Sequence, residues 1–201
     1  MRILVIVCTL LLVGCASGYH PLRPRSNYFQ NATDYYGVEL SYRMGILREH
    51  RNKKYAKRED KKALRVVSVK LVNHTDAPVV VGEDFRFFSG NSELALMDPY
   101  VAHRELKQGV PIYLLYLLLT PMQLYTTDES GNTETTPIGL FIGPGIALGN
   151  MAGAGAANQN FLQELVEYNL INKTIEPGQT VHGLITIRDN GYNAIRLEFD
   201  Y

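Results

Sequence analysis

Alternating apolar and polar residues predict β-strands toward both ends of the chain. Residues 38–44 and 67–72 place apolar side chains at every second position, and residues 79–88 are rich in Val and Phe. The same alternation returns in residues 180–188 and 195–201. Strands with one apolar face, separated by short polar turns, are typical of antiparallel sheets.

Turn residues connect these segments. Asn190-Gly191 separates the last two, and because both positions tolerate a positive φ angle, we expect those strands to pair as a hairpin. The pattern as a whole indicates an α+β, mainly β fold with an antiparallel, β-sandwich-like sheet. Together with the Asn73-His74-Thr75 turn, it also resembles the immunoglobulin-like domains of secreted bacterial proteins, which implies an immunoglobulin-like sandwich.

A long apolar region interrupts the strand pattern. Val110–Tyr125 is almost wholly apolar, and Ile138–Ala157, beyond a polar connector, has no charged residue. Apolar residues then recur at spacings of three and four, which indicates an amphipathic helix: Phe161, Leu162, Leu165, Val166 and Tyr168. We therefore expect a helical, Gly/Ala-rich insertion at about residues 100–172.

The uncharged stretch has two interpretations. Gly145, Gly149 and Gly153 would share one helix face, where small residues let a second helix pack closely, as in membrane helix pairs. The stretch is long enough to cross a bilayer, with Val110–Tyr125 as its partner. Pro144, however, predicts a helix break that leaves too few residues to span. We favour a buried helix packed on the sheet or on the first apolar segment.

The N-terminus resembles the leader of a bacterial lipoprotein. Met1-Arg2 is a short positive region, Ile3–Val13 is apolar but too short to span a bilayer, and Leu12-Val13-Gly14-Cys15 resembles the lipobox. The resemblance implies that residues 1–14 are a signal peptide that is removed, and that Cys15 carries acyl chains, palmitate among them. Several acyl chains hold a protein on its membrane.

The same resemblance implies a domain organisation and a location. Residues 15–35 would be the lipidated cysteine and a tether, followed by one domain over residues 36–201. Ala16 resembles the signal that directs enterobacterial lipoproteins to the outer membrane, and the lack of an acidic run favours the periplasmic face over the cell surface. With Cys8 removed and Cys15 acylated, the mature chain would hold no free thiol.

A second resemblance covers part of the C-terminal half. The pattern NM-x-x-A-x-x-AN-x-x-F-x-x-EL, followed by PGQT-x-x-GLI, is similar to uncharacterised envelope lipoproteins of Bacteroidetes-type bacteria. This resemblance implies no particular activity.

Charge is distributed unevenly. The formal net charge is zero, which argues against nucleic acid as a partner. Ten of the twenty basic residues lie between Arg43 and Arg65. Such a run attracts an anionic partner, here an envelope protein or a glycolipid, although it is also typical of a solvated loop. The contact residues that we expect are Arg51, Lys53, Lys54, Lys57, Arg58, Lys61 and Lys62.

No pattern of residues indicates catalysis. The sequence lacks the His-Glu-x-x-His metal motif, the Gly-x-Ser-x-Gly nucleophile turn and a phosphate-binding loop. Glu164 and Glu167 fall on the polar face of the amphipathic helix, with no carboxylate expected opposite them, so a hydrolase acting on surface glycans is the weakest hypothesis. We expect no enzymatic activity, no metal site and no cofactor.

These features predict a lipid-anchored protein of the bacterial envelope. Its expected role is non-enzymatic: a structural or binding module, attached to the membrane through its N-terminal lipid, that contacts another envelope component. The alternative is a membrane-active protein whose Gly-rich hairpin, residues 110–157, inserts or oligomerises in the bilayer.

Overall fold

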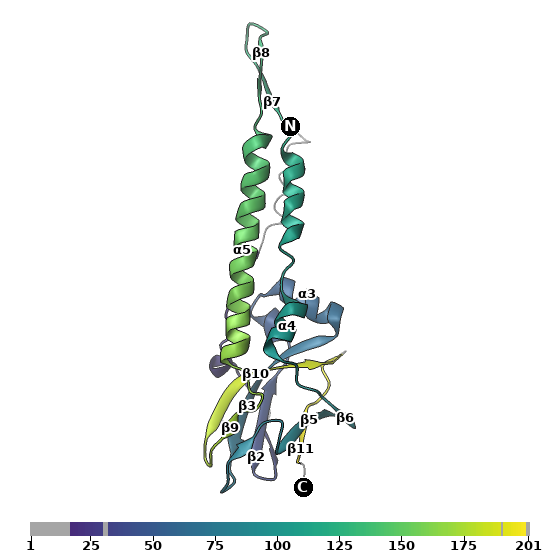
Figure 1. Cartoon of the computed structure of the whole chain (residues 1–201), viewed down its shortest axis with the longest axis vertical. Coiled ribbons are helices and arrows are strands. Elements are labelled where there is room, and N and C mark those ends of the chain that lie inside the picture. The colour runs from purple at the N-terminus through teal and green to yellow at the C-terminus, as the bar shows by residue number, and fades with distance from the viewer. Residues whose placement is uncertain (1–16, 30–31, 190, 200–201) are drawn as a thin grey trace. The chain divides into compact units, whose positions relative to one another are not determined.

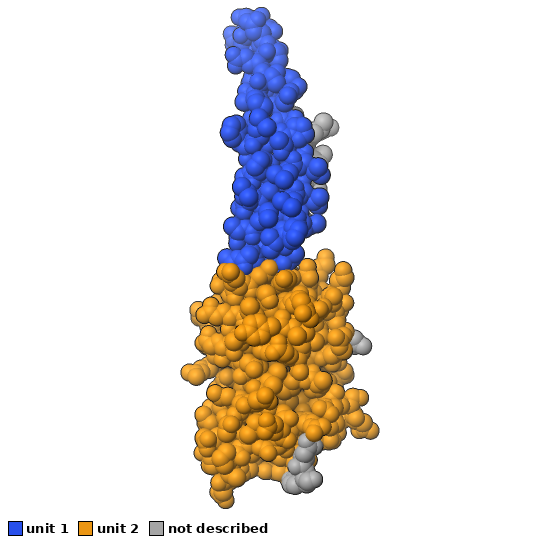
Figure 2. Space-filling model, viewed as in Figure 1, with its two compact units in different colours: residues 1–18, 108–157 blue, residues 19–107, 158–201 orange. Residues whose placement is uncertain are grey.

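The computed structural model describes residues 17–29, 32–189 and 191–199. The chain forms two compact units (Figure 2): unit 1 comprises residues 1–18 and 108–157, and unit 2 comprises residues 19–107 and 158–201. The expected insertion is therefore divided, because its central part forms unit 1 and its two ends belong to unit 2. The expected signal peptide and Cys15 lie outside the described residues.

Unit 2 is built on antiparallel sheets (Figure 1). The largest has the strand order β1-β2-β3-β10, with β1 (Ala32–Tyr35), β2 (Val38–Arg43), β3 (Leu64–Asn73) and β10 (Thr180–Arg188). A second has the order β11-β5-β6, with β5 (Phe85–Ser89), β6 (Ser92–Glu93) and β11 (Arg196–Phe199). A short pair joins β4 (Val79–Val80) to β9 (Thr174–Ile175). Since 35% of the residues are helical and 31% lie in strands, the fold is mixed rather than mainly β.

The expected hairpin between the last two strands is wrong. β10 pairs along its whole length with β3, and β11 pairs instead with β5, where Leu197 lies opposite Phe87. Burial explains the difference, because β3 is buried over most of its length and offers β10 a partner of nearly matching length, with Ile185 opposite Val67. The turn residues alone do not select the partner strand.

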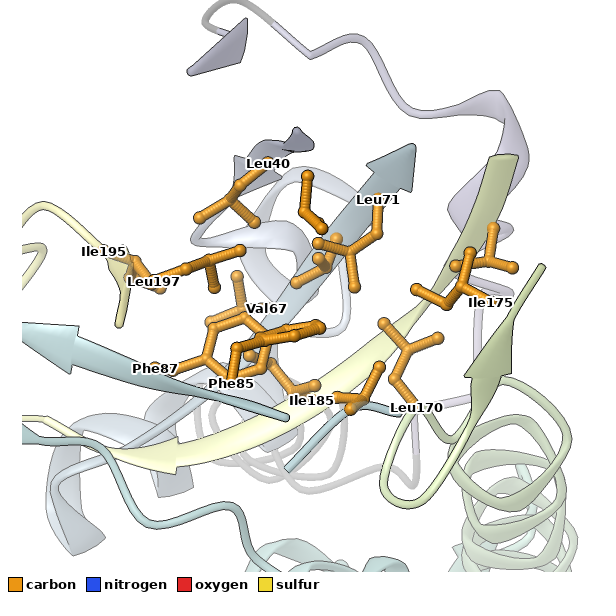
Figure 3. Packing of buried hydrophobic residues seen from close by; sticks show 14 of the residues in the cluster. Leu40, Val67, Leu71, Phe85, Phe87, Leu170, Ile175, Ile185, Ile195 and Leu197 are labelled. Atoms are coloured by element: carbon orange, nitrogen blue, oxygen red, sulfur yellow. The ribbon is translucent and has the colours of Figure 1, made fainter. Parts of the chain in front are cut away.

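The first core cluster contains residues from both of the larger sheets (Figure 3). Val67 and Leu71 of β3 and Ile185 of β10 belong to the same buried cluster as Phe85 of β5 and Leu197 of β11. These residues occupy alternate positions on their strands, as the period of two predicts. The alternation that identified the strands therefore also identified the residues of this core.

Helices cover the other face of the largest sheet. They are α2 (Ile46–Glu49), α3 (Lys53–Lys62), α4 (Pro99–Leu106) and the C-terminal part of α5 (Gly139–Glu167). Val66 of β3 and Leu184 of β10 form a second buried cluster with Tyr55 of α3, Leu106 of α4 and Phe161 of α5. The basic segment is therefore helical and rests on the sheet, rather than being a solvated loop.

The expected tether is partly folded onto unit 2. Leu22 is fully buried in the second cluster, and a 3-10 helix, η1 (Pro24–Ser26), follows it. The sequence suggested a tether because this segment lacks periodicity. Its contacts are made to residues far away in the chain, so no local pattern reports them.

Unit 1 is a helical hairpin with a β-ribbon between its arms. One arm contains η2 (Pro111–Leu119), the ribbon contains β7 (Leu124–Thr127) and β8 (Thr133–Thr136), and the other arm is the first part of α5 (Figure 1). The backbone N–H of Gly139 donates to the carbonyl oxygen of Met122 at 2.9 Å and closes the ribbon end of the hairpin. The polar connector between the two apolar segments is therefore structured.

A glycine permits the close packing of β10 under the end of α5. A Cβ atom added at Gly183 would lie 2.4 Å from Cγ of Leu170 and 2.5 Å from the carbonyl oxygen of Tyr168. That oxygen accepts a hydrogen bond from the backbone N–H of Leu184 at 2.7 Å, so the contact cannot easily relax.

We predict that Gly183→Ala lowers the free energy of unfolding by about 1–3 kcal/mol, because the added methyl group overpacks this contact. Urea unfolding followed by circular dichroism measures the change. Thr180→Ala, at an exposed position of the same strand, is the matched control and should change stability by less than about 0.5 kcal/mol. Equal stability of the two variants would contradict the proposed overpacking.

Candidate functional surfaces

Unit 1 exposes many large apolar side chains. The exposed ones on η2 and β7 are Ile112, Leu114, Leu115, Leu117, Leu118, Leu124 and Tyr125, and those on the first part of α5 are Leu140, Phe141 and Leu148. Leu118 and Phe141 are the extreme cases, with exposed fractions of 75% and 79%. Single exposed apolar residues are common on proteins, but a concentration of this kind marks a surface that contacts a partner or a bilayer.

Helix α5 is long and apolar enough to cross a membrane, and among the described residues it is the one helix that meets this criterion. Only 22% of its apolar window is buried. The core helix of a soluble protein would be mostly buried, and a signal sequence would lie near the N-terminus. The favoured interpretation of residues 138–157 as a buried helix is therefore wrong for most of these side chains.

The two arms do pack closely, but not through the predicted glycines. Gly145, Gly149 and Gly153 are exposed, and a Cβ added at the first two would meet no described atom within 4 Å. The close-packing positions are Gly139 and Gly143, where a Cβ would lie 2.2 Å from the carbonyl oxygen of Leu119 and 3.0 Å from that of Tyr116. The four-residue spacing is right, but the contact lies one to two turns nearer the ribbon.

Pro144 does not end the helix. α5 is continuous from Gly139 to Glu167, with Pro144 inside it. Pro144 is the sixth residue of α5, so it removes the hydrogen bond that an N–H at this position would donate to the carbonyl oxygen of Leu140, but the helix does not end there. The argument from Pro144 against a spanning helix therefore fails.

Within residues 108–157 of unit 1, charge is confined to the ribbon and its turn. Between Gln108 and Ala157 the charged residues are Asp128, Glu129 and Glu134, all exposed and all in or beside the turn that joins β7 to β8. Asp128 accepts backbone hydrogen bonds from Ser130 at 2.9 Å and Asn132 at 2.8 Å, which form the turn. The hairpin thus has uncharged arms and an acidic tip.

Helix α3 of unit 2 carries the predicted basic surface. Lys53, Lys57 and Lys61 recur at a spacing of four and share one exposed face. Arg51 and Lys62 are also exposed, whereas Lys54 and Arg58 are half-buried. The structure therefore brings the predicted contact residues together on or beside one helix.

Few of these cations are neutralised. Lys62 pairs with Glu105 at 3.0 Å, and the neighbouring Arg48 pairs with Asp60 at 2.6 Å. Within the described part of the chain, no ion pair involves Arg51, Lys53, Lys57, Arg58 or Lys61. The exposed face of α3 thus keeps a positive potential.

Glu59 faces the interior from the other side of α3. Its carboxyl group is 3% exposed and accepts the backbone N–H of Val66 at 2.7 Å, which joins α3 to β3. Burial raises the pKa of Glu59 to about 7, against the opposing effects of this hydrogen bond and of Arg65. Glu59 therefore lies on the buried face of α3 and does not pair with the cations on the exposed face.

The N-terminal segment of unit 2 is attached beside this basic helix. Asn52, directly before α3, accepts the backbone N–H of His20 at 2.9 Å and donates to its carbonyl oxygen at 2.7 Å. Tyr19 lies with its ring centroid 5.7 Å from that of Tyr55 and 5.6 Å from that of Phe161. The chain therefore enters unit 2 against the buried side of α3.

Glu164 completes this attachment. Its carboxylate is 8% exposed and accepts the backbone N–H groups of Leu22 at 2.8 Å and Arg23 at 2.7 Å, as well as the hydroxyl of Tyr19. Burial, followed by this hydrogen bond, raises the pKa of the Tyr19 hydroxyl above its ordinary value. The expected position of Glu164 on the polar face of the helix is wrong, because its carboxylate is buried against the N-terminal segment.

No local signal could have identified the partners of Glu164, which precede it by 141 to 145 residues. Glu167, one turn further along, is exposed as expected. Among the residues that the structure describes, no group of three His, Cys, Asp or Glu side chains could hold a metal ion. The lipidation predicted at Cys15 lies outside the described residues and stays a prediction.

Comparisons with known proteins add no further identification. A scan against protein-family models, a search of curated proteins and a search of solved structures each found no match.

We predict that Glu164→Ala releases the N-terminal segment, because the backbone N–H groups of Leu22 and Arg23 lose a charged acceptor that contributes about 1.5–3 kcal/mol for each bond. Hydrogen exchange at these two amides should accelerate by at least about tenfold. Glu167→Ala removes an exposed carboxylate from the same helix and should leave both rates unchanged. Unaltered exchange in Glu164→Ala would show that the carboxylate does not hold the segment.

Proposed function

We propose that the chain is a lipid-anchored, non-enzymatic protein of the bacterial envelope whose helical hairpin, residues 110–157, enters a lipid bilayer. The exposure of large apolar side chains on both arms of this hairpin is the observation that carries the proposal. Of the two roles considered from the sequence, it favours the membrane-active protein over a module that only binds another envelope component.

The distribution of charge supports a bilayer as the partner of the hairpin. Charged residues are absent from both arms and gathered at the tip. Residues 139–157 of α5 extend for roughly 28 Å at 1.5 Å per residue, close to the thickness of a hydrocarbon core. Helical backbone satisfies its own hydrogen bonds, which a bilayer requires. A soluble protein partner would not require arms that are free of charge over such a length.

The N-terminal attachment supports a second contact with the same membrane. Three residues separate Cys15 from Tyr19, and the four residue-to-residue steps between them can span at most about 14 Å. Because Tyr19 packs against Tyr55 of α3, acyl chains on Cys15 would keep the basic helix near the lipid headgroups. An acyl anchor combined with a basic surface binds anionic membranes more firmly than either does alone.

The finer fold and the location follow from the same proposal. We take the two larger sheets of unit 2 to be the layers of an immunoglobulin-like sandwich, since residues from both contribute to one buried cluster. The lipobox-like leader and Ala16 support the outer membrane, on its periplasmic face, as the location. The similarity to envelope lipoproteins of Bacteroidetes-type bacteria agrees with these proposals but adds no activity.

The hairpin is tested with a chain from Ala16 to Tyr201. This chain contains no cysteine, so it cannot be held on a membrane by acyl chains. We predict that this chain floats with phospholipid vesicles, and that Leu118→Asp with Phe141→Asp reduces the bound fraction more than about 100-fold. An aspartate in a bilayer is unfavourable by roughly 2.5–3.5 kcal/mol. Tyr100→Asp changes a comparably exposed aromatic residue of unit 2 and should float as before. A parent chain that stays monodisperse without detergent and does not float would refute insertion.

The basic face is tested by Lys53→Glu, Lys57→Glu and Lys61→Glu combined. We predict at least about 100-fold weaker binding to phosphatidylglycerol vesicles, since each cation near an anionic surface contributes about 1 kcal/mol. Binding to neutral phosphatidylcholine vesicles should not change. The control combines Arg86→Glu, Lys107→Glu and Arg188→Glu, which alter the net charge equally at exposed but scattered positions. Equal losses in both triple variants would mean that α3 is not a specific contact surface.

A further inference from the structure

Unit 2 contains a polar cleft that neither the anchor nor the hairpin uses. The helices cover only one end of the sheet face that carries Val66 and Leu184. Further along the same two strands, on the same face, Lys70 and His182 lie opposite each other in register. A cleft of ≈ 690 Å³ opens beside His182, a volume in the range of small-molecule sites.

The walls of the cleft come from four parts of unit 2. Arg25 of η1 lines it, together with Glu167 at the end of α5, Lys173 in the following connection, and Thr180 and His182 of β10. The end of α5 is held against β10 through Gly183, so these walls are part of the packed fold. The cleft is therefore a built feature of the unit rather than a gap between mobile loops.

Positive charge predominates in the cleft. The side chains of Arg25 and Lys173 form no ion pair or hydrogen bond within the described part of the chain. Lys70, opposite His182 on the neighbouring strand, is paired with Glu39 at 3.2 Å. Glu167 is the acidic residue of the lining. Burial, and then the nearby cations Lys70 and Arg25, lower the pKa of His182. The unpaired cations thus direct their field toward the cleft.

The uncharged lining suits a polar ligand. Asn169, Gln179 and Thr180 add amide and hydroxyl groups to the cations. His182 also contacts Phe29, with the two ring centroids 5.9 Å apart. Hydrogen-bonding groups combined with two unpaired cationic side chains suit the binding of a polar ligand that carries an oxyanion.

We propose that this cleft binds a small polar ligand with a phosphate or carboxylate group, which Arg25 and Lys173 neutralise while the side chains of β10 bind its uncharged part. The site is independent of the hairpin and of the basic face of α3. The oxyanion could be carried by a soluble sugar acid or sugar phosphate, or by a lipid headgroup, and the experiment separates these sources.

The experiment uses the full chain in micelles of a neutral detergent, with the imidazole C–H signals of His182 followed by NMR. Glucose 1-phosphate and galacturonate are titrated against glucose and against chloride at matched ionic strength. Binding of an oxyanion offsets the field of Arg25 and Lys70, so the pKa of His182 should rise in the presence of the anionic sugars and stay unchanged with glucose or chloride. Arg25→Gln and Lys173→Gln should each weaken the response about tenfold. Lys107→Gln removes an exposed cation that does not line the cleft and should leave the response unchanged.

Phosphatidylglycerol added to the micelles supplies the lipid arm. A response of His182 to the soluble anions supports a sugar-like ligand, and a response to phosphatidylglycerol alone, lost in Arg25→Gln, supports a headgroup bound in the cleft. Responses to chloride equal to those of the oxyanions, or titrations unaffected by both substitutions, would overturn the site. Loss of vesicle flotation by the hairpin variants has no bearing on either result.

Discussion

The carboxylate of Glu164 connects the N-terminal segment of unit 2 to helix α5. By accepting the backbone N–H groups of Leu22 and Arg23, it fixes the N-terminal segment on α5, and the same segment reaches α3 through His20 and Tyr19. A buried carboxylate is stable only when its oxygens are hydrogen-bonded, so release of the N-terminal segment would leave Glu164 in an unfavourable environment. Tyr19 is consequently held beside Tyr55 of the basic helix.

The two units differ in how they treat apolar surface. Unit 2 buries its apolar residues in two clusters, one shared by its sheets and one between the sheet and the helices. Unit 1 packs its arms at Gly139 and Gly143 but leaves most of its large side chains exposed. Apolar surface exposed to water is unfavourable by about 25 cal/mol per Å², so the exposed side chains of this hairpin are unfavourable in water alone.

The sequence separation of the residues that make each contact explains which predictions were right and which were wrong. The strands of residues 38–44 and 180–188 and the helix around Phe161 were predictable, because periodicity is a local property. The partner of β10, the burial of Glu164 and the close-packing glycines were not, because each depends on residues far away in sequence. Pro144 misled for a different reason: a proline removes one hydrogen bond of a helix, but α5 continues past it to Glu167.

The sequence by itself determined the elements, the absence of charge from both arms of the hairpin and the concentration of cations between Arg43 and Arg65, since composition and period are written along the chain. Only the tertiary structure decided which surfaces remained open. In the folded protein, the cations of α3 are exposed and Glu164 is buried, while Leu118 and Phe141 remain exposed. Arg25 and Lys173 line the same cleft. Exposure depends on which elements pack together, and that choice is made by long-range burial rather than by local pattern.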